Sequence, residues 1–314
     1  GKLPLNLRYE SHIQSGTFNF DAVKARYVKL VFEIDTSDDW GWRRYKENPM
    51  QIGTIQCFQS PRISMWEPKS GQSKKIKHEH QQAFIQELEH AATEPLVEKW
   101  VVNSEQIINL TQHLQSNGTL KWQTAPAGEW TILRVGYTST LRTNGPASDA
   151  GRGYECDKMS VKATRKHFEG YVKRMNEHSQ QTVGKPIDFM QMESWEAGIQ
   201  NWTDGFDEEF RKRCGYSIYP FLPVLADGRV VDSYIKSNAF LRDMRKTVSE
   251  LMAEHYWAVM YELAAEHEIT VLGEGSGNQH YLYDPIRYHE QTDYPMGEFW
   301  TGGQGYPRVD CKNA

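Results

Sequence analysis

Glutamate side chains follow two short apolar runs of this chain, at positions where carboxylates can act together. Glu193 and Glu196 come after the first run, and Glu274 closes the second. Glu298 stands in a third segment, between glycine and aromatic residues. Cleavage of a glycosidic bond needs two carboxyl groups on opposite sides of the bond, one protonated to assist the leaving oxygen and one ionised to activate water or attack carbon. Because aromatic surroundings raise a carboxyl pKa and keep an acid protonated, these glutamates predict a glycosidase-type site.

The spacing of the first two glutamates limits how many of them act. Glu193 and Glu196 are three residues apart, so a continuing strand would aim their side chains at opposite faces. One of the pair is therefore expected to be structural unless the strand has already ended.

Aromatic and amide side chains surround these glutamates. The chain holds ten Trp and sixteen Tyr residues, more than a core of this size needs. Trp195, Trp202 and Trp300 lie close to the glutamates in sequence, as do the amides of Gln200 and Asn201. Any single ring is better explained as an anchor of the core. Together they favour a carbohydrate surface, because the apolar face of a pyranose stacks on aromatic rings while its hydroxyls pair with polar groups.

The segments that position these glutamates alternate between strand and helix. The expected elements are strands at 187–192 and 269–272 and helices that begin after Ser160, span 206–213 and run over 237–267. Apolar residues recur at three- and four-residue steps along the longest helix, where His255 is expected to be a hydrogen-bonded core residue. Such alternation implies parallel strands with right-handed crossovers. Ligands of these folds bind at the carboxyl ends of the strands, where the glutamates are expected.

The first 137 residues show a different pattern, in which short apolar runs alternate with turns. Expected strands lie at 25–34, 52–58, 99–102, 107–111 and 128–137. We expect a β-sandwich-like accessory region over residues 1–137, packed on an α/β region that covers residues 138–314.

Composition excludes several classes of protein. The net charge of -5 and pI near 6.2 give no electrostatic reason to expect nucleic acid or an anionic membrane as partner. No apolar run approaches the ~18 residues that a membrane-spanning helix needs. The four cysteines lie far apart without zinc-site spacing, and we expect free, mostly buried thiols.

Several long stretches resemble glycoside hydrolase family 106, the α-L-rhamnosidases. They are ESWEAGIQNWTDGFDEEFRKRCGYSIYPFLPVLADGRVV, FLRDMRKTVSELMAEHYW and PMGEFW, with GYTSTLRTNGPASDAGRGYECDK earlier in the chain. The resemblance extends roughly from Ala25 to Gly303 and is strongest from Trp130 onward. Ordered motifs of this length are far more specific than isolated acidic residues.

This resemblance implies a (β/α)8 barrel of the TIM type, an inverting hydrolysis and a calcium ion near the sugar. Carried over by motif, Glu196 would be the general acid and Glu298 the base that activates water. Glu274 would contact the substrate or the calcium. The chain departs from the family pattern in the Gly-Ser-Gly after Glu274 and in Glu193, where Asp is expected. These departures concern substrate detail more than reaction type.

A terminal α-L-rhamnosyl unit is the substrate that the resemblance implies. The residues expected to bind it are Trp195, Asn201, Trp202, Glu274, Trp300 and Asn144. Asn144 belongs to a second tier of candidates, with Glu155, Asp157 and His280, and each of these is better explained by a structural role. The carbohydrate substrate favours a periplasmic or secreted location.

Residues 138–314 suffice for about half of an eight-unit barrel, since a whole one takes ~250 residues. We therefore expect the 314 residues alone to be poorly soluble or inactive. Two rivals remain open. One is a polysaccharide lyase or a glycosidase of other specificity on the same scaffold, and the other is a non-catalytic carbohydrate-binding protein.

Overall fold

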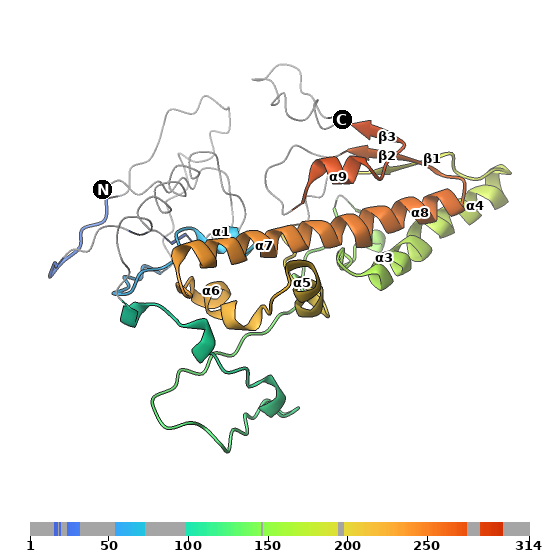
Figure 1. Ribbon diagram of the computed structural model, residues 1–314. Coiled ribbons are helices and arrows are strands. Elements are labelled where there is room, and N and C mark those ends of the chain that lie inside the picture. The colour runs from blue at the N-terminus through green and yellow to red at the C-terminus, as the bar shows by residue number, and fades with distance from the viewer. Residues whose placement is uncertain are drawn as a thin grey trace.

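The computed structural model describes residues 16–17, 19, 24–31, 54–72, 98–145, 147–193, 198–274 and 283–297 of the chain. Within them the protein is a mixed α/β structure in which a long helical rod packs against a small parallel sheet (Figure 1). The expected α/β class is therefore confirmed. Among the residues with a described structure, no helix is long and apolar enough to cross a membrane.

The sheet has three parallel strands in the order β1-β2-β3. They are β1 (Phe189–Met192), β2 (Thr270–Glu274) and β3 (Tyr294–Met296). Met192 lies opposite Gly273, and Glu274 lies opposite Met296. The helices between β1 and β2, and α9 (Pro285–His289) between β2 and β3, supply the connections that parallel strands require. The predicted alternation of strand and helix is confirmed for these segments.

One helical rod occupies most of the connection between β1 and β2. It consists of α7 (Tyr234–Met252), one π-helical turn η8 (Ala253–Trp257) and α8 (Ala258–Glu266). The rod begins three residues before the predicted start, because Ser233 caps it by accepting a hydrogen bond from the backbone N–H of Lys236 at 3.1 Å. His255 Nδ1 lies 2.7 Å from the carbonyl oxygen of Met159, which confirms a hydrogen-bonded histidine.

Shorter helices flank the rod. Ser160 caps α3 (Val161–Phe168), which continues through the π-helix η6 (Glu169–Lys173) into α4 (Arg174–Val183). The others are α1 (Trp66–Lys69), α5 (Phe206–Cys214), α6 (Leu222–Asp227) and the 3₁₀ helices η2 (Glu98–Trp100), η3 (Ser104–Gln106), η4 (Thr111–His113), η5 (Asp149–Gly151) and η7 (Tyr219–Phe221). Both predicted helices, after Ser160 and at 206–213, are present.

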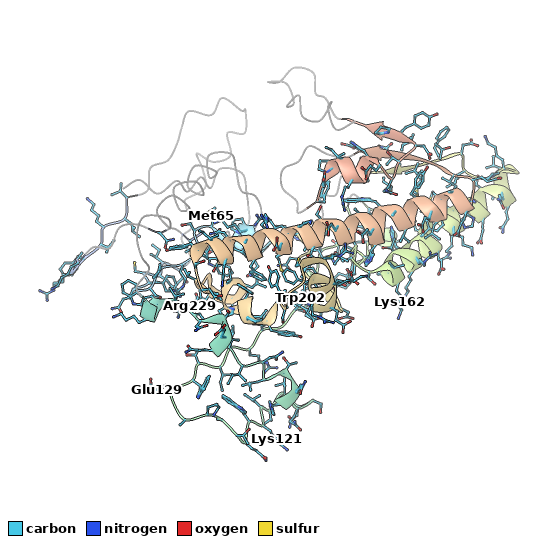
Figure 2. All side chains as sticks on the ribbon, viewed as in Figure 1. Met65, Lys121, Glu129, Lys162, Trp202 and Arg229 are labelled. Carbon is cyan, nitrogen blue, oxygen red and sulfur yellow. The ribbon has the colours of Figure 1, made fainter. Side chains whose placement is uncertain are left out.

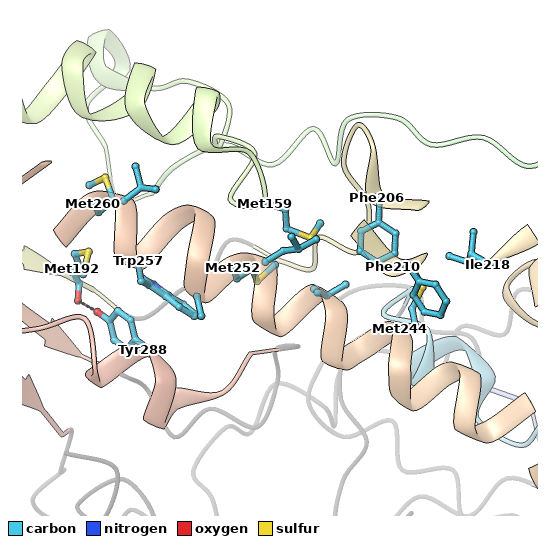
Figure 3. Close-up of a cluster of buried hydrophobic side chains, with 14 of the residues drawn as sticks. Met159, Met192, Phe206, Phe210, Ile218, Met244, Met252, Trp257, Met260 and Tyr288 are labelled. Carbon is cyan, nitrogen blue, oxygen red and sulfur yellow. Dashed lines mark hydrogen bonds between the residues drawn. The ribbon is translucent and has the colours of Figure 1, made fainter. Parts of the chain in front are cut away.

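The hydrophobic core follows the buried side of the rod. Phe206 and Phe210 of α5 are fully buried there with Met244 of α7 (Figure 3). Further along the rod, Trp257 packs on Tyr288 of α9 with ring centroids 4.7 Å apart. Trp257 and Tyr288 belong to a second group of buried residues, which packs against the sheet near the ends of its strands.

The expected strands of the first 137 residues are not found in their described part. Residues 24–31 and 54–58 contain no strand, and 98–100 form a 3₁₀ helix. Ile132 and Val135 are 62% and 45% exposed, so the alternating run 128–137 lacks a packed face among the described residues. Alternation predicts a strand only where a neighbouring strand completes the hydrogen-bonded ladder. The sandwich-like region and its boundary at 137 stay predictions.

Three of the four cysteines lie in the described residues, and all three are free thiols as expected. Cys57 is exposed, and Cys156 and Cys214 are half-buried. The expectation of mostly buried thiols was therefore wrong for these three. Cys214 has a polar neighbour, since its sulfur lies 3.6 Å from the hydroxyl of Thr247.

Candidate active site

Carboxylates gather at one edge of the sheet because all three strands end there. Glu193 directly follows β1, and Glu274 is the last residue of β2. Glu298 stands two residues after the last residue of β3. The register places the ends of β1 and β2 side by side, and those of β2 and β3 likewise. The carboxyl ends of the three strands thus lie along one edge of the sheet, which we name the carboxyl edge.

Several predicted site residues lie outside the described residues. They are Trp195, Glu196, His280, Glu298 and Trp300. Their roles stay predictions. The structure does describe both flanks of the segment that holds Glu196, namely Met192 and Glu193 before it and residues 198–204 after it.

Tyr288 supports the carboxyl edge from α9. Its side chain is 2% exposed, and its hydroxyl donates a 2.6 Å hydrogen bond to the carbonyl oxygen of Met192 (Figure 3). Burial is the main cause that raises the pKa of Tyr288, and neighbouring tyrosines and the carboxylates of Glu274 and Glu193 raise it further. The phenol therefore stays protonated and holds the end of β1 as a hydrogen-bond donor.

Gly273 leaves room for this support. A Cβ atom at this position would lie 2.2 Å from Thr292 Cγ2 and 3.1 Å from the Tyr288 hydroxyl. Cβ atoms essentially never lie within 3.0 Å of a heavy atom of a distant residue, so the middle of the carboxyl edge requires glycine.

A loop at residues 142–155 lies next to the segment that follows Glu196. Asn144 donates through Nδ2 to the carbonyl oxygen of Gly151 at 3.0 Å and accepts at Oδ1 from the N–H of Gly153 at 2.8 Å. Its amide therefore closes the loop, and contact with a substrate stays a prediction. Arg142 covers Gly198, where a Cβ atom would lie 3.0 Å from the arginine Nε. A cationic group thus lies beside Gly198, which follows Glu196 by two residues in sequence.

Residues 198–204, which we name the return segment, use their polar and aromatic side chains to bind the rest of the fold. Asn201 Nδ2 donates to the carbonyl oxygen of Ser70 at 3.0 Å. Trp202 lies next to α5, with its ring centroid 4.8 Å from that of Phe206 (Figure 2). The Trp202 ring also packs on Tyr137, with the two ring centroids 6.1 Å apart. Both side chains hold structure in place, and their predicted contact with sugar stays a prediction.

Asp157 joins the return segment to the start of α3. Its Oδ1 accepts hydrogen bonds from the N–H of Met159 at 3.0 Å and from Gln200 Nε2. Its Oδ2 accepts from Thr203 Oγ1 at 2.5 Å. The hydrogen bonds of Asp157 with Gln200 and Thr203 were not predicted, because these partners lie 43 and 46 residues away in sequence.

Glu155 and Lys158 form an ion pair of 2.6 Å beside Tyr256. The lysine side chain is only 7% exposed, and its ammonium lies 5.4 Å from the centre of the Tyr256 ring. Glu155 is therefore a structural partner of Lys158 here. Neither Lys158 nor Tyr288 is among the site residues predicted from the sequence. Lys158 ends the motif GYTSTLRTNGPASDAGRGYECDK, whereas Tyr288 lies in none of the motifs.

A calcium site needs six to eight oxygen ligands. Among the described residues, no group of three or more His, Cys, Asp or Glu side chains could hold a metal ion. Glu193 and Glu274 supply two carboxylates at the carboxyl edge, which is fewer than calcium requires. The described part of the chain therefore does not form a complete calcium site.

A family model described as alpha-L-rhamnosidase matches residues 23–313. The chain belongs to glycoside hydrolase family 106. This confirms the resemblance carried by the long motifs.

Two known proteins are similar to this family 106 chain. A Formosa agariphila protein named "Putative beta-glucuronidase" is 39% identical over 210 residues, which are 67% of this chain and 18% of that protein. A solved structure of a rhamnosidase from Novosphingobium sp. PP1Y matches 82% of this chain and 24% of its own, with 23% identity and a TM-score of 0.65. The first comparison shows a relative whose name gives another sugar, and the second supports the fold. The chain spans about a fifth to a quarter of their lengths.

Proposed function

We propose that this chain carries the catalytic acid and base of an inverting glycoside hydrolase that removes terminal α-L-rhamnose from glycans or glycosides. Family membership supports the reaction class. The observation that carries the proposal is the carboxyl edge, where parallel strands bring segments from distant parts of the chain together. In the sequence, Glu298 stands two residues after β3 and Glu196 four residues after β1, so we infer that both reach this edge.

In the proposed reaction, Glu196 is the general acid and Glu298 the general base. Glu196 donates its proton to the glycosidic oxygen as the bond from that oxygen to the anomeric carbon breaks. Glu298 takes a proton from a water molecule whose oxygen forms the new bond on the opposite face. Exchange with solvent then returns both carboxyl groups to their starting states. This geometry needs about 6.5–9.5 Å between the two carboxyl groups, enough for the water.

The sugar is proposed to stack on Trp195, Trp202 or Trp300, with Asn201, Asn144 and Glu274 as polar partners. Trp202 and Asn201 already hold the return segment, so they would form the wall of the site rather than mobile contacts. The three-stranded sheet is proposed to be part of a (β/α)8 barrel that begins at residue 138. The sandwich-like region of residues 1–137 is proposed to pack on this barrel. The whole protein is proposed to act in the periplasm or outside the cell.

We propose that calcium binds near the sugar, with Glu274 as one oxygen ligand and Glu193 as a second. Both carboxylates lie at the carboxyl edge, and hard oxygen ligands suit this ion. Further ligands would have to come from outside the described residues. When bound, the ion would offset the repulsion among the carboxylates and help to orient the sugar hydroxyls.

A sugar that carries a carboxylate is the second candidate substrate. The name of the Formosa agariphila relative points to a glucuronide. Arg142 supports this alternative, because its guanidinium covers Gly198 and could pair with a sugar carboxylate. Glu193 and Glu274 argue against it, because their charges repel an anionic sugar unless a cation intervenes.

A proton NMR time course on the full-length parent protein tests the proposal, with 4-nitrophenyl α-L-rhamnoside and 4-nitrophenyl β-D-glucuronide as parallel substrates. We expect hydrolysis of the rhamnoside, with β-L-rhamnose as the first product. Removing calcium with EDTA should lower the rate, and restoring the ion should recover it. Turnover of the glucuronide alone would establish the second candidate, and α-L-rhamnose as first product would exclude inversion. An ultraviolet-absorbing unsaturated product would indicate a lyase, and binding without turnover a carbohydrate-binding protein.

A further inference from the structure

Asp157 is the acceptor in three hydrogen bonds that join two separate segments. One donor, the N–H of Met159, belongs to the turn that leads into α3. The other two donors, Gln200 Nε2 and Thr203 Oγ1, belong to the return segment. Gln200 is also an acceptor, because its Oε1 accepts a hydrogen bond from the backbone N–H of Lys158 at 3.0 Å. Asp157, Gln200 and Thr203 therefore form a reciprocal clasp.

The clasp is connected to the helical rod. Met159 is buried, and its carbonyl oxygen lies 2.7 Å from His255 Nδ1 in the π-helical turn of the rod. Thr203 is also buried, with 6% of its surface exposed. Movement of the return segment would therefore have to break these part-buried hydrogen bonds. Leaving a buried polar group such as the Thr203 hydroxyl unpaired costs about 1–3 kcal/mol.

The clasp holds one flank of the segment that carries Glu196. Gln200 follows Glu196 by four residues, which limits the separation of their Cα atoms to about 14 Å. On the other flank, Tyr288 holds the carbonyl oxygen of Met192. Buried Tyr288 thus holds one flank, and the clasp, with buried Thr203 and half-buried Asp157 and Gln200, holds the flank on the side of the return segment.

We propose that Asp157 is a positioning residue that, through Gln200 and Thr203, sets the direction in which the Glu196 carboxyl group meets the glycosidic oxygen. This inference rests on the proposed function of Glu196. A carboxylate suits the role because it only accepts hydrogen bonds and has two oxygens for three donors. Displacing a catalytic group by about 1 Å costs on the order of 10²-fold in rate, so a loosened clasp lowers the efficiency of proton donation.

The decisive variant is Thr203→Val in the full-length parent protein, because it removes one hydroxyl and keeps the side-chain shape. Thr247→Val is the matched control, since Thr247 is also buried and its hydroxyl donates to a backbone carbonyl of α7 at 2.9 Å, away from the clasp. Asp157→Asn is the second variant, which keeps one acceptor and guards against loss of the fold. Glu196→Gln is measured in parallel.

The readout is kcat/KM on two α-L-rhamnosides, one with a 4-nitrophenoxide leaving group and one with a methoxide leaving group. Methoxide needs a proton from the acid, whereas 4-nitrophenoxide departs without one. For Thr203→Val we expect a loss at least about tenfold greater on the methyl rhamnoside. Asp157→Asn should show a smaller loss of the same kind, and Thr247→Val should show no preference between leaving groups.

The outcomes separate this inference from the proposed function. If Glu196→Gln loses activity selectively on the methyl rhamnoside while Thr203→Val and Asp157→Asn lose both activities equally, the clasp has only a structural role and the inference is overturned. If Glu196→Gln shows no leaving-group preference, Glu196 is not the acid, and the proposed function and the inference both fall.

Discussion

Gly273 is the residue at which the carboxyl edge tolerates least change. Replacement by alanine would place a methyl group 2.2 Å from Thr292 Cγ2. Overpacking of this kind typically costs about 1–3 kcal/mol, because side chains or backbone must shift to relieve it. We therefore predict that Gly273→Ala lowers the urea midpoint of the full-length parent protein and reduces its activity, since the shift occurs beside Glu274 and Tyr288.

A double substitution identifies the cause. Thr292→Ser removes the Cγ2 atom and leaves the nearest atoms at 3.1 Å, so Gly273→Ala with Thr292→Ser should recover most of the lost stability. Gly136→Ala is the matched control, because an added Cβ there meets no atom within 4 Å. If Thr292→Ser gives no recovery, the contact with Thr292 is not what makes glycine necessary.

Single residues of the site differ in how far the sequence reveals them. The glutamates are recognisable because each follows an apolar run or a glycine, and the described ones do lie at strand ends. Tyr288 and Asp157 are not recognisable in this way. Tyr288 acts on Met192, 96 residues away, and Asp157 acts on Gln200, 43 residues away. Pairings of such sequence separation exist only after the chain has folded.

At the scale of elements, Arg213 connects α5 to the long rod. Its guanidinium lies 3.3 Å from Glu250 and 2.5 Å from Glu254, and 3.2 Å from Glu209 within α5. The hydrogen bond from Arg213 is the main cause that lowers the pKa of Glu254 from its ordinary value of 4.5. A lowered folded-state pKa means that the ionised carboxylate stabilises the fold above pH 4.5, and that this contribution is lost as the pH falls toward the lowered value.

We predict that Arg213→Met lowers the thermal unfolding midpoint most at pH 7, and that its difference from the wild type narrows as the pH falls below 4.5. The effect is modest, because the Glu254 side chain is 48% exposed and water screens the pair. Thermal unfolding of both proteins across this pH range provides the measurement. Arg242→Met is the control, since that arginine is 71% exposed and pairs only with its neighbour Asp243 among the described residues. A difference that stays constant with pH would contradict the account.

Elements with strong local signals were predictable, and those that depend on distant partners were not. The rod was visible from its apolar period, and α3 from its serine cap. The π-helical turn at 253–257 was not predicted, because it has no simple sequence signature. The prediction of strands before residue 137 was wrong for the described residues, because it considered each segment alone. Apolar alternation describes a face that could pack, whereas a strand also needs a neighbour.

At the scale of the whole molecule, the sheet order brings together parts of the chain that are far apart in sequence. Glu196 and Glu298 are separated by 102 residues, yet β1 and β3 both pair with β2 and end at the same edge. A parallel sheet requires such long connections, and the rod supplies the longest of them. The central claim is that these two carboxylates act on one sugar from opposite sides.

The most direct test is a kinetic cycle of Glu196→Gln, Glu298→Gln and the double variant of the full-length parent protein, measured on methyl α-L-rhamnoside. We predict that each single substitution lowers kcat by about 10²–10⁴-fold, because an acid or a base is lost from one transition state. The double variant should be little worse than the poorer single variant, since residues that act as a unit are not additive. Near-normal rates in either single variant, or losses that multiply in the double variant, would contradict the account.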